Sequence, residues 1–341
     1  MSENNCCYAS GECCEKPPIQ TVSTQLLFKD RLGGWKVRWG IGRTNYTVEP
    51  GVYKIGKPDE KAPVLVSANY KLTFDFLRKE LTGVNCWLLI LDTKGINVWC
   101  AAGKGSFGTE ELIEKIRETH MAEIVSRREL ILPQLGAPGI NGSEIKKQTE
   151  FSVIYGTIRA QDIKAFLDAG NKATEEMRTV KFDFKDRIVL TPMEVVLATQ
   201  KLIVFFGILF LLNLVATKPF GVIDFVAYVG ATIAGTFITP ILLPLIPGKA
   251  FALKGAIIGV FWAMGVMWFS GWIESEQWFL AMGYLLVLPS ISAYFAMNFT
   301  GSSTYTSPSG VLKEMKIALP FMIVAFVVGG ILILLSRIFG I

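Results

Sequence analysis

The 341-residue sequence contains a single histidine, His120, and no run of the type Cys-x-x-Cys-x-x-Cys. Histidine-dependent serine and cysteine hydrolases need a general base, and this histidine is most simply a helix C-terminal residue. The cysteine spacing excludes a four-iron cluster held by this chain alone. The sequence also lacks a nucleotide-binding motif at the place in the fold where such a motif works. The pattern Gly103-x-Gly105-x-x-Gly108 lies about a dozen residues beyond the preceding predicted strand, and Val98 occupies the position of the first glycine of a phosphate-binding loop.

Charged residues are scarce in the C-terminal part of the chain. Only 7 of the 34 Lys+Arg and 4 of the 29 Asp+Glu follow Gln200. We therefore expect residues 188–341 to form an all-α transmembrane domain. Five stretches are apolar enough, and about long enough, to span a bilayer, which needs roughly 20 residues. They are 202–217, 222–238, 250–272, 278–299 and 317–335.

The loop charges predict an orientation in the membrane. Seven basic residues fall on one side, against Lys218 and Arg337 on the other, and the positive side is cytoplasmic. A multi-pass protein of the cytoplasmic (inner) membrane is predicted, with a cytoplasmic N-terminal domain and the C-terminus outside. Asp224 is the only acidic residue inside one of these five stretches, so both an anchor or docking platform and a transport role stay open. The seven basic residues are Lys185, Arg187, Lys201, Lys249, Lys254, Lys313 and Lys316.

Residues 1–25 form a polar tail without the apolar core of a signal peptide, so the N-terminal domain is expected in the reducing cytosol. Adjacent cysteines on a flexible tail make soft thiolate pairs suited to Hg(II), Cu(I) or Zn(II). A tail that captures a soft metal and a disordered tail with inert thiols are both consistent with this pattern. The net charge of +5 is spread out, so nucleic-acid binding has little support. The tail cysteines are Cys6, Cys7, Cys13 and Cys14.

Strand and helix patterns alternate across the second predicted domain, residues 26–187. This alternation predicts an α/β fold with a parallel sheet covered on both faces. The ligand of such a sheet binds beyond the carboxyl ends of the strands, where the loops at 67–69, 97–105 and 156–157 converge. The predicted strands are 63–67, 84–91, about 123–130 and 151–155, and the predicted helices are 71–81, 109–118, a short one near Glu144, and 160–169.

A short helix beginning at Val98 is expected between the predicted strand 84–91 and the predicted helix 109–118. Asn97 is a suitable N-cap, because its side chain can accept the backbone N–H of Cys100. The cysteine then lies in the first turn, near the positive end of the helix dipole, which favours the metal-binding thiolate. Gly103 and Gly105 are expected to end the helix. A buried structural cysteine at a strand-to-helix corner is the alternative.

The string Asn-Val-Trp-Cys-Ala-Ala-Gly-Lys at 97–104 resembles the cap-helix signature of the corrinoid protein of microbial mercury methylation, the HgcA family. That family is related to the large subunit of the corrinoid iron-sulfur protein. The resemblance continues in 45–51 and 64–72 and covers roughly 39–166, so it does not include the cysteine tail. It implies a Rossmann-like corrinoid-binding domain with a cap helix, followed by the five-helix transmembrane domain.

The resemblance implies that Cys100 is the catalytic residue and the lower axial ligand of cobalt in a cobalamin-type corrinoid. An axial thiolate pushes electron density through the metal, which favours delivery of methyl as a carbanion equivalent to the electrophile Hg(II). The protein would then be a corrinoid-dependent methyltransferase that forms methylmercury under anaerobic conditions. Trp99 packs under the ring or is a simple core aromatic, and Lys104 contacts a corrin amide or solvent. The expected cofactor-binding residues are Ser67, Asn69, Asn97, Val98, Trp99, Cys100, Ala101, Ala102, Gly103, Lys104 and Gly105.

The resemblance also implies partners. An external electron donor is needed, and the family points to a ferredoxin-like protein with two four-iron clusters, of the HgcB type. The methyl group would come from the folate-linked one-carbon pathway, and membrane lipid surrounds the helices. Two other functions stay open: a corrinoid methyl carrier with another acceptor, and a membrane metal-binding or transport protein.

Overall fold

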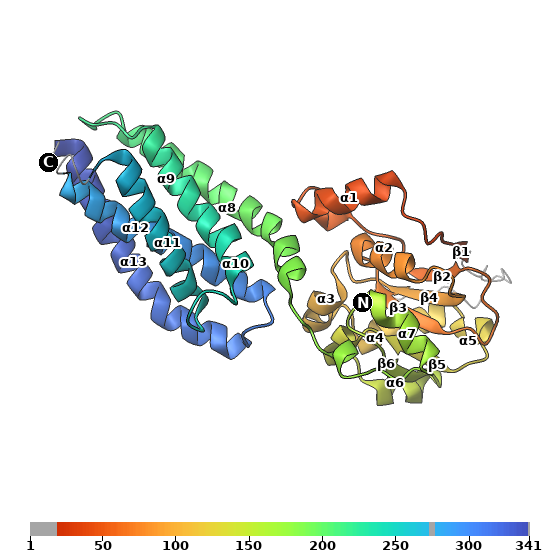
Figure 1. The fold of residues 1–341 in the computed structure, drawn as a ribbon. Helices are drawn as coiled ribbons and strands as arrows, with labels where there is room; N and C mark the ends of the chain where they lie inside the picture. The colour runs from red at the N-terminus through yellow and green to blue at the C-terminus, as the bar shows by residue number, and fades with distance from the viewer. Residues whose placement is uncertain (1–18, 273–276, 340–341) are drawn as a thin grey trace, which may run out of the picture. The chain divides into compact units, whose positions relative to one another are not determined.

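The computed structural model describes residues 19–272 and 277–339 (Figure 1). It divides into two compact units, one formed by residues 19–37 and 41–180, the other by 38–40 and 181–339. The first unit is a six-stranded sheet with helices, and the second is helical. The predicted fold class, an α/β region followed by five long apolar helices, is confirmed.

The sheet has the strand order β1-β2-β4-β3-β5-β6. Four of its strands, β4, β3, β5 and β6, are parallel, as predicted. The prediction missed β2, which pairs antiparallel with β4 and parallel with the two-residue strand β1. The strands are β1 Gln20–Thr21, β2 Gly51–Ile55, β3 Val64–Ala68, β4 Cys86–Leu91, β5 Glu129–Leu132 and β6 Ser152–Tyr155.

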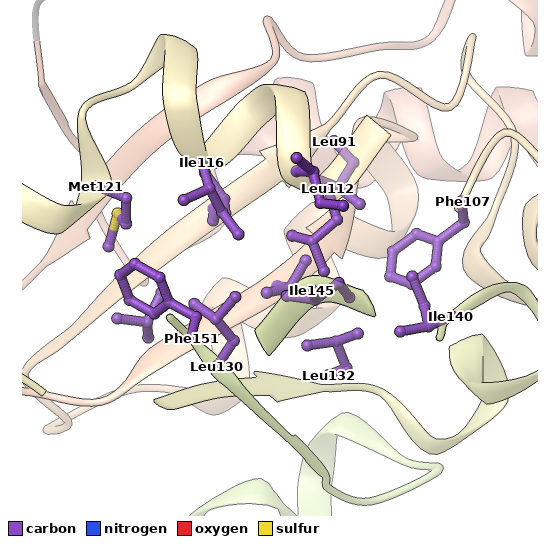
Figure 2. Packing of buried hydrophobic residues seen from close by; sticks show 14 of the residues in the cluster. Leu91, Phe107, Leu112, Ile116, Met121, Leu130, Leu132, Ile140, Ile145 and Phe151 are labelled. Carbon is purple, nitrogen blue, oxygen red and sulfur yellow. The ribbon is translucent and has the colours of Figure 1, made fainter. Parts of the chain in front are cut away.

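Helices cover both faces of the sheet. As a result, all six residues of β4 and all five of β3 are buried. Side chains of α2 and α7 pack on one face, together with Leu88 and Ile131. Side chains of α4, α5 and α6 pack on the other face, where Leu112 and Phe151 are completely buried (Figure 2). The helices of this unit are α1 Phe28–Arg38, α2 Lys71–Glu80, α3 Val98–Lys104, α4 Thr109–Glu118, α5 Met121–Ile124, α6 Gly142–Thr149 and α7 Ile163–Asp168, with short 3-10 turns η1 Arg43–Asn45, η2 Gln134–Gly139, η3 Ala160–Asp162 and η4 Glu176–Arg178.

The strand predicted near 123–130 was placed too early. His120 adopts a left-handed conformation with φ 49°, and the chain then makes the short helix α5 before β5 begins at Glu129. Met121 inserts its side chain into the core from this turn and is fully buried. Met121 and Ile124 therefore pack against the core from a helix, and β5 ends at Leu132.

The second unit contains five helices long and apolar enough to span a membrane. The first of them is the largest departure from the predicted spans, since it begins at Phe184 and not at 202. A capping box starts it, with Asp183 Oδ1 accepting from the Asp186 N–H at 3.1 Å and Asp186 Oδ2 accepting in return at 3.3 Å. The spans are Phe184–Leu212 (α8), Val222–Leu242 (α9 Val222–Ile233, the π-turn η5 Ala234–Ile238 and α10 Thr239–Leu242), Phe251–Ser270 (α11), Trp278–Ser302 (α12 Trp278–Asn298 with η6 Phe299–Ser302) and Ser309–Phe339 (within α13 Pro308–Phe339).

Small residues and one charge network hold these helices together. A Cβ on Gly255 of α11 would lie 2.5 Å from Ala296 Cβ on α12, so the two helices pack closely at this glycine. Asp224 is 3% exposed and caps the start of α9 by accepting the Gly221 N–H at 2.6 Å. The same carboxylate accepts hydrogen bonds from Tyr284 of α12 and Arg337 of α13. Asp224, the acidic residue of the second span, is thus paired.

Candidate functional site

The cap helix α3 forms as its sequence predicts. Asn97 Oδ1 accepts the Cys100 N–H at 2.9 Å and the helix begins at Val98. Gly105 ends it in a left-handed conformation, with φ 85° and its N–H directed at Ala102 O. Gly103 lies inside the helix, so the expectation that both glycines terminate it was wrong for this one.

The two faces of α3 have different surroundings. Val98, Ala101 and Ala102 are buried against the sheet and the η2 turn. A Cβ on Gly139 of η2 would lie only 3.2 Å from Ala102 Cα, so the small side chains on this face let the turn approach. The opposite face carries residues in contact with solvent. They are Trp99, Cys100, Gly103 and Lys104, and Trp99 is 45% exposed.

A cavity of about 370 Å³ lies at the carboxyl ends of the parallel strands. The strand order reverses there, because β3 is flanked by β4 on one side and β5 on the other. Such a switch point is where open α/β sheets bind their ligands. Six of its lining residues belong to the three loops expected to converge: Ser67, Asn97, Val98, Trp99, Gly156 and Thr157.

The remaining cavity walls escaped sequence reasoning. Phe76 of α2, Phe166 of α7, and Pro133 and Leu135 after β5 line the same space. The Pro133 segment follows β5, so correct placement of that strand would have found it. Gln134 Oε1 is a buried acceptor without a hydrogen-bond partner among the described residues. Cys100 and Gln134 do not line the cavity themselves, but Cys100 follows the lining residue Trp99, and Gln134 lies between the lining residues Pro133 and Leu135. A mostly apolar cavity with a thiol and an unused acceptor next to its lining residues fits a large ring that carries amide N–H groups on its rim.

Asn69 lies behind the site. It is 5% exposed, and its side-chain oxygen accepts from the Thr93 N–H at 3.1 Å, the Thr93 hydroxyl at 2.9 Å and the Gly95 N–H at 3.0 Å. Its Nδ2 donates to Asp92 Oδ1 at 3.0 Å. The amide is therefore engaged in fixing the loop that leads into α3, and it does not line the cavity.

Among the described residues, the other cysteine and the histidine, which could also bind a metal or take part in catalysis, do not line this cavity. Cys86 is completely buried in β4, and burial raises the pKa of its thiol to about 12. His120 interacts with Glu123 at 3.2 Å on the surface. Within 19–272 and 277–339 no group of three or more His, Cys, Asp or Glu side chains could hold a metal ion. The tail cysteines, Cys6, Cys7, Cys13 and Cys14, lie outside the described residues.

Comparison with known proteins defines the class of the first unit. Residues 41–167, which include β2 to β6 and α3, match the family described as CdhD, the CO dehydrogenase/acetyl-CoA synthase delta subunit. This region is accordingly related to the large subunit of the corrinoid iron-sulfur protein.

Individual proteins of known name are similar to the same region of the chain. The chain is 37% identical over 123 residues to the acetyl-CoA decarbonylase/synthase complex subunit gamma of Methanopyrus kandleri, covering 36% of this chain and 26% of the relative. It is 31% identical over 124 residues to the corrinoid/iron-sulfur protein large subunit of Moorella thermoacetica, covering 36% and 27%. The chain thus spans about a quarter of the length of the curated relatives it matches.

Proposed function

We propose that this protein is a membrane-tethered corrinoid methyltransferase that converts Hg(II) to methylmercury. The observation that carries the proposal is Cys100, an exposed thiol in the first turn of a capped helix beside the switch-point cavity. The relation to corrinoid proteins supports the cofactor class. The sequence of α3 supports mercury as the acceptor, because it resembles the signature of the mercury-methylation family.

Each residue of the site would make a different contact with the cofactor. Cys100 would supply a sulfur ligand to cobalt, and Asn97 fixes the turn that presents it. Trp99 would cover the apolar ring from the cavity edge, while Gln134 Oε1 would accept a hydrogen bond from a peripheral amide. When bound, the corrinoid would supply a methyl group carried on cobalt. A thiolate ligand is electron-rich and soft, which suits transfer of methyl to an electrophilic metal ion.

The rest of the reaction requires partners. The sequence has no cluster-binding cysteine run, so reducing electrons would come from a ferredoxin-like protein with two four-iron clusters. Methyl groups would come from the folate-linked one-carbon pathway. The five apolar helices would tether the domain to the cytoplasmic face of the inner membrane, with the C-terminus outside.

A corrinoid methyl carrier with another acceptor is the second candidate. It is favoured by the relatives themselves, which are named as subunits of acetyl-CoA decarbonylase/synthase complexes. The two functions share Cys100 and differ in what accepts the methyl group.

The test compares two thiol deletions in the anaerobically purified, corrinoid-reconstituted protein. We expect Cys100→Ala to remove the thiolate features of the corrinoid spectrum and to reduce methylation of isotopically labelled Hg(II) to background. Cys86→Ala removes a buried thiol from β4 and should leave both signals intact at equal protein levels.

Three outcomes separate the candidates. Full activity in Cys100→Ala would refute the axial thiolate. Absence of corrinoid bands after reconstitution of the unaltered protein would refute the cofactor class. Thiolate-ligated corrinoid that never methylates Hg(II) would favour the methyl carrier.

A further inference from the structure

Helix α1 presents an apolar stripe to solvent. Phe28, Leu32 and Trp35 follow one another at helical spacing, so they lie on one face. Their exposed fractions are 78%, 38% and 59%, and the preceding Leu27 is 70% exposed. An exposed group of large apolar side chains of this kind marks an interaction surface.

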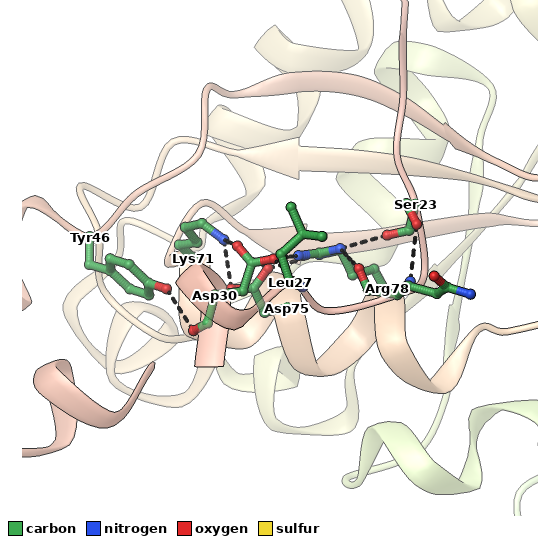
Figure 3. Close-up of polar contacts among 8 residues, drawn as sticks. Ser23, Leu27, Asp30, Tyr46, Lys71, Asp75 and Arg78 are labelled. Atoms are coloured by element: carbon green, nitrogen blue, oxygen red, sulfur yellow. Dashed lines mark hydrogen bonds and ion pairs between the residues drawn. The ribbon is translucent and has the colours of Figure 1, made fainter. Parts of the chain in front are cut away.

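The opposite face of α1 is fixed to α2, so the stripe does not turn inward. Asp30 forms ion pairs with Lys71 and Arg78, each at 2.7 Å, and Asp75 bridges the same two cations (Figure 3). Val37 is 1% exposed on this inner face. The docked face thus uses the only acidic residue of the helix.

Basic residues flank the stripe. Lys29 and Lys36 lie beside it on one edge and Arg31 on the other, and all three are exposed. An apolar face bordered by Lys and Arg and containing Trp and Phe is typical of helices that lie in the interface of a membrane. The long basic side chains reach outward to phosphate groups while the rings enter the acyl boundary.

We propose that α1 docks parallel to the membrane surface, with Phe28, Leu32 and Trp35 inserted into an anionic leaflet. The charge pattern selects this occupant, since the exposed charges of the helix are positive and anionic headgroups are negative. The same chain carries five helices able to span a bilayer, which keeps such a surface within reach. The inference is independent of which group accepts the methyl.

The experiment uses the full-length protein inserted in nanodiscs that contain about 30% anionic phospholipid. A photoreactive p-benzoylphenylalanine replaces Trp35, or Phe28 in a second variant. The control carries it in place of Glu114, an exposed residue of α4 on the other face of the sheet. We expect both stripe positions to give at least about tenfold more lipid adduct, detected by mass, than the control.

A charge variant tests the flanking residues. Combined Lys29→Gln, Arg31→Gln and Lys36→Gln substitutions should lower the adduct at position 35 by about fivefold for each charge removed, in anionic nanodiscs only. Equal lipid labelling at positions 35 and 114, or cross-links from position 35 to protein and not to lipid, would overturn the proposal. Insertion of all variants into nanodiscs shows that the spans are intact.

Discussion

Asn69→Ala should loosen the loop before the cap helix without disturbing the sheet. The substitution removes four hydrogen bonds and leaves the Thr93 and Gly95 N–H groups without acceptors, Thr93 being completely buried. An orphaned buried donor costs about 1–3 kcal/mol, and Gly95 is only partly buried, so its donor is counted at about 1 kcal/mol. The two donors together place the loss near 2–4 kcal/mol in the local opening free energy. The free energy is lost at this loop, next to Cys100, and not across the whole domain.

Amide hydrogen exchange in the full-length protein measures this loss. A local loss of 2–4 kcal/mol corresponds to roughly 30- to 1000-fold faster exchange at Thr93 and Gly95. Asn141→Ala is the matched control, because Asn141 caps α6 through a 3.2 Å bond from the Glu144 N–H. It should leave exchange at both amides unchanged.

A corrinoid-binding measurement links the loop to function. If the loop places α3, Asn69→Ala should also weaken binding of reconstituted corrinoid although Asn69 does not line the cavity. Exchange within twofold of the unaltered protein at both amides would refute the reasoning. Fast exchange with unchanged corrinoid affinity would show that the loop is not needed to present Cys100.

Three further predictions concern the tail, the membrane helices and α1. Serine at all four tail cysteines should lower methylmercury formation only at limiting Hg(II), and complete loss at saturating Hg(II) would place the tail in the reaction centre. A chain ending at Asp186 keeps all six strands and α3, so it should bind corrinoid but support little methylation in cells; full methylation would make the helices dispensable. Burial opposes ionisation of Asp30, but hydrogen bonds from Lys71, the Leu27 N–H and Arg78 prevail and lower its pKa from 3.8 to about 2. The stability that Asp30 contributes should therefore be complete above about pH 4 and be lost as the pH falls through 2, which exchange across α1 can follow, with Asp30→Asn as the control that shows no such loss.

Local signals in the sequence were sufficient for some elements. Helix α4 has the predicted bounds Thr109–Glu118, and α3 begins where the Asn97 cap places it. Both depend on interactions within a few residues. Strand β2, Gly51–Ile55, was missed because its structure comes from pairing with β4, more than thirty residues further along the chain.

The site could be predicted only in part, because the sequence does not show in which direction each side chain points. A capped helix defines two faces, but it does not say which one meets the core, so Ala101 and Ala102 were expected at the cofactor and lie in the packing interface. Asn69 follows a strand at the ligand edge, and only the fold shows that its amide is directed at Thr93 and Gly95. Pro133 and Leu135 were missed as cavity residues because the strand before them, β5, had been placed too early.

Hydropathy located the five long apolar helices but not their ends. Glu194 and Lys201 interrupt the apolar pattern of α8, so the predicted span began after them. The capping box at Asp183 and Asp186 starts the helix earlier and makes it 29 residues long. At 1.5 Å per residue this is about 43 Å, longer than the roughly 30 Å hydrocarbon core.

The Asp224–Arg337 pair has a consequence for the order of biogenesis. The two residues are 113 positions apart, and synthesis proceeds from the N-terminus. In a bilayer the carboxylate of α9 would therefore enter before its cation has been translated. An unpaired charge costs about 3 kcal/mol at the centre of a span, and less at Asp224, the third residue of its span. Insertion of α13 would relieve this cost, because it would bring Arg337 to Asp224 at the same time as it adds its own helix to the bundle.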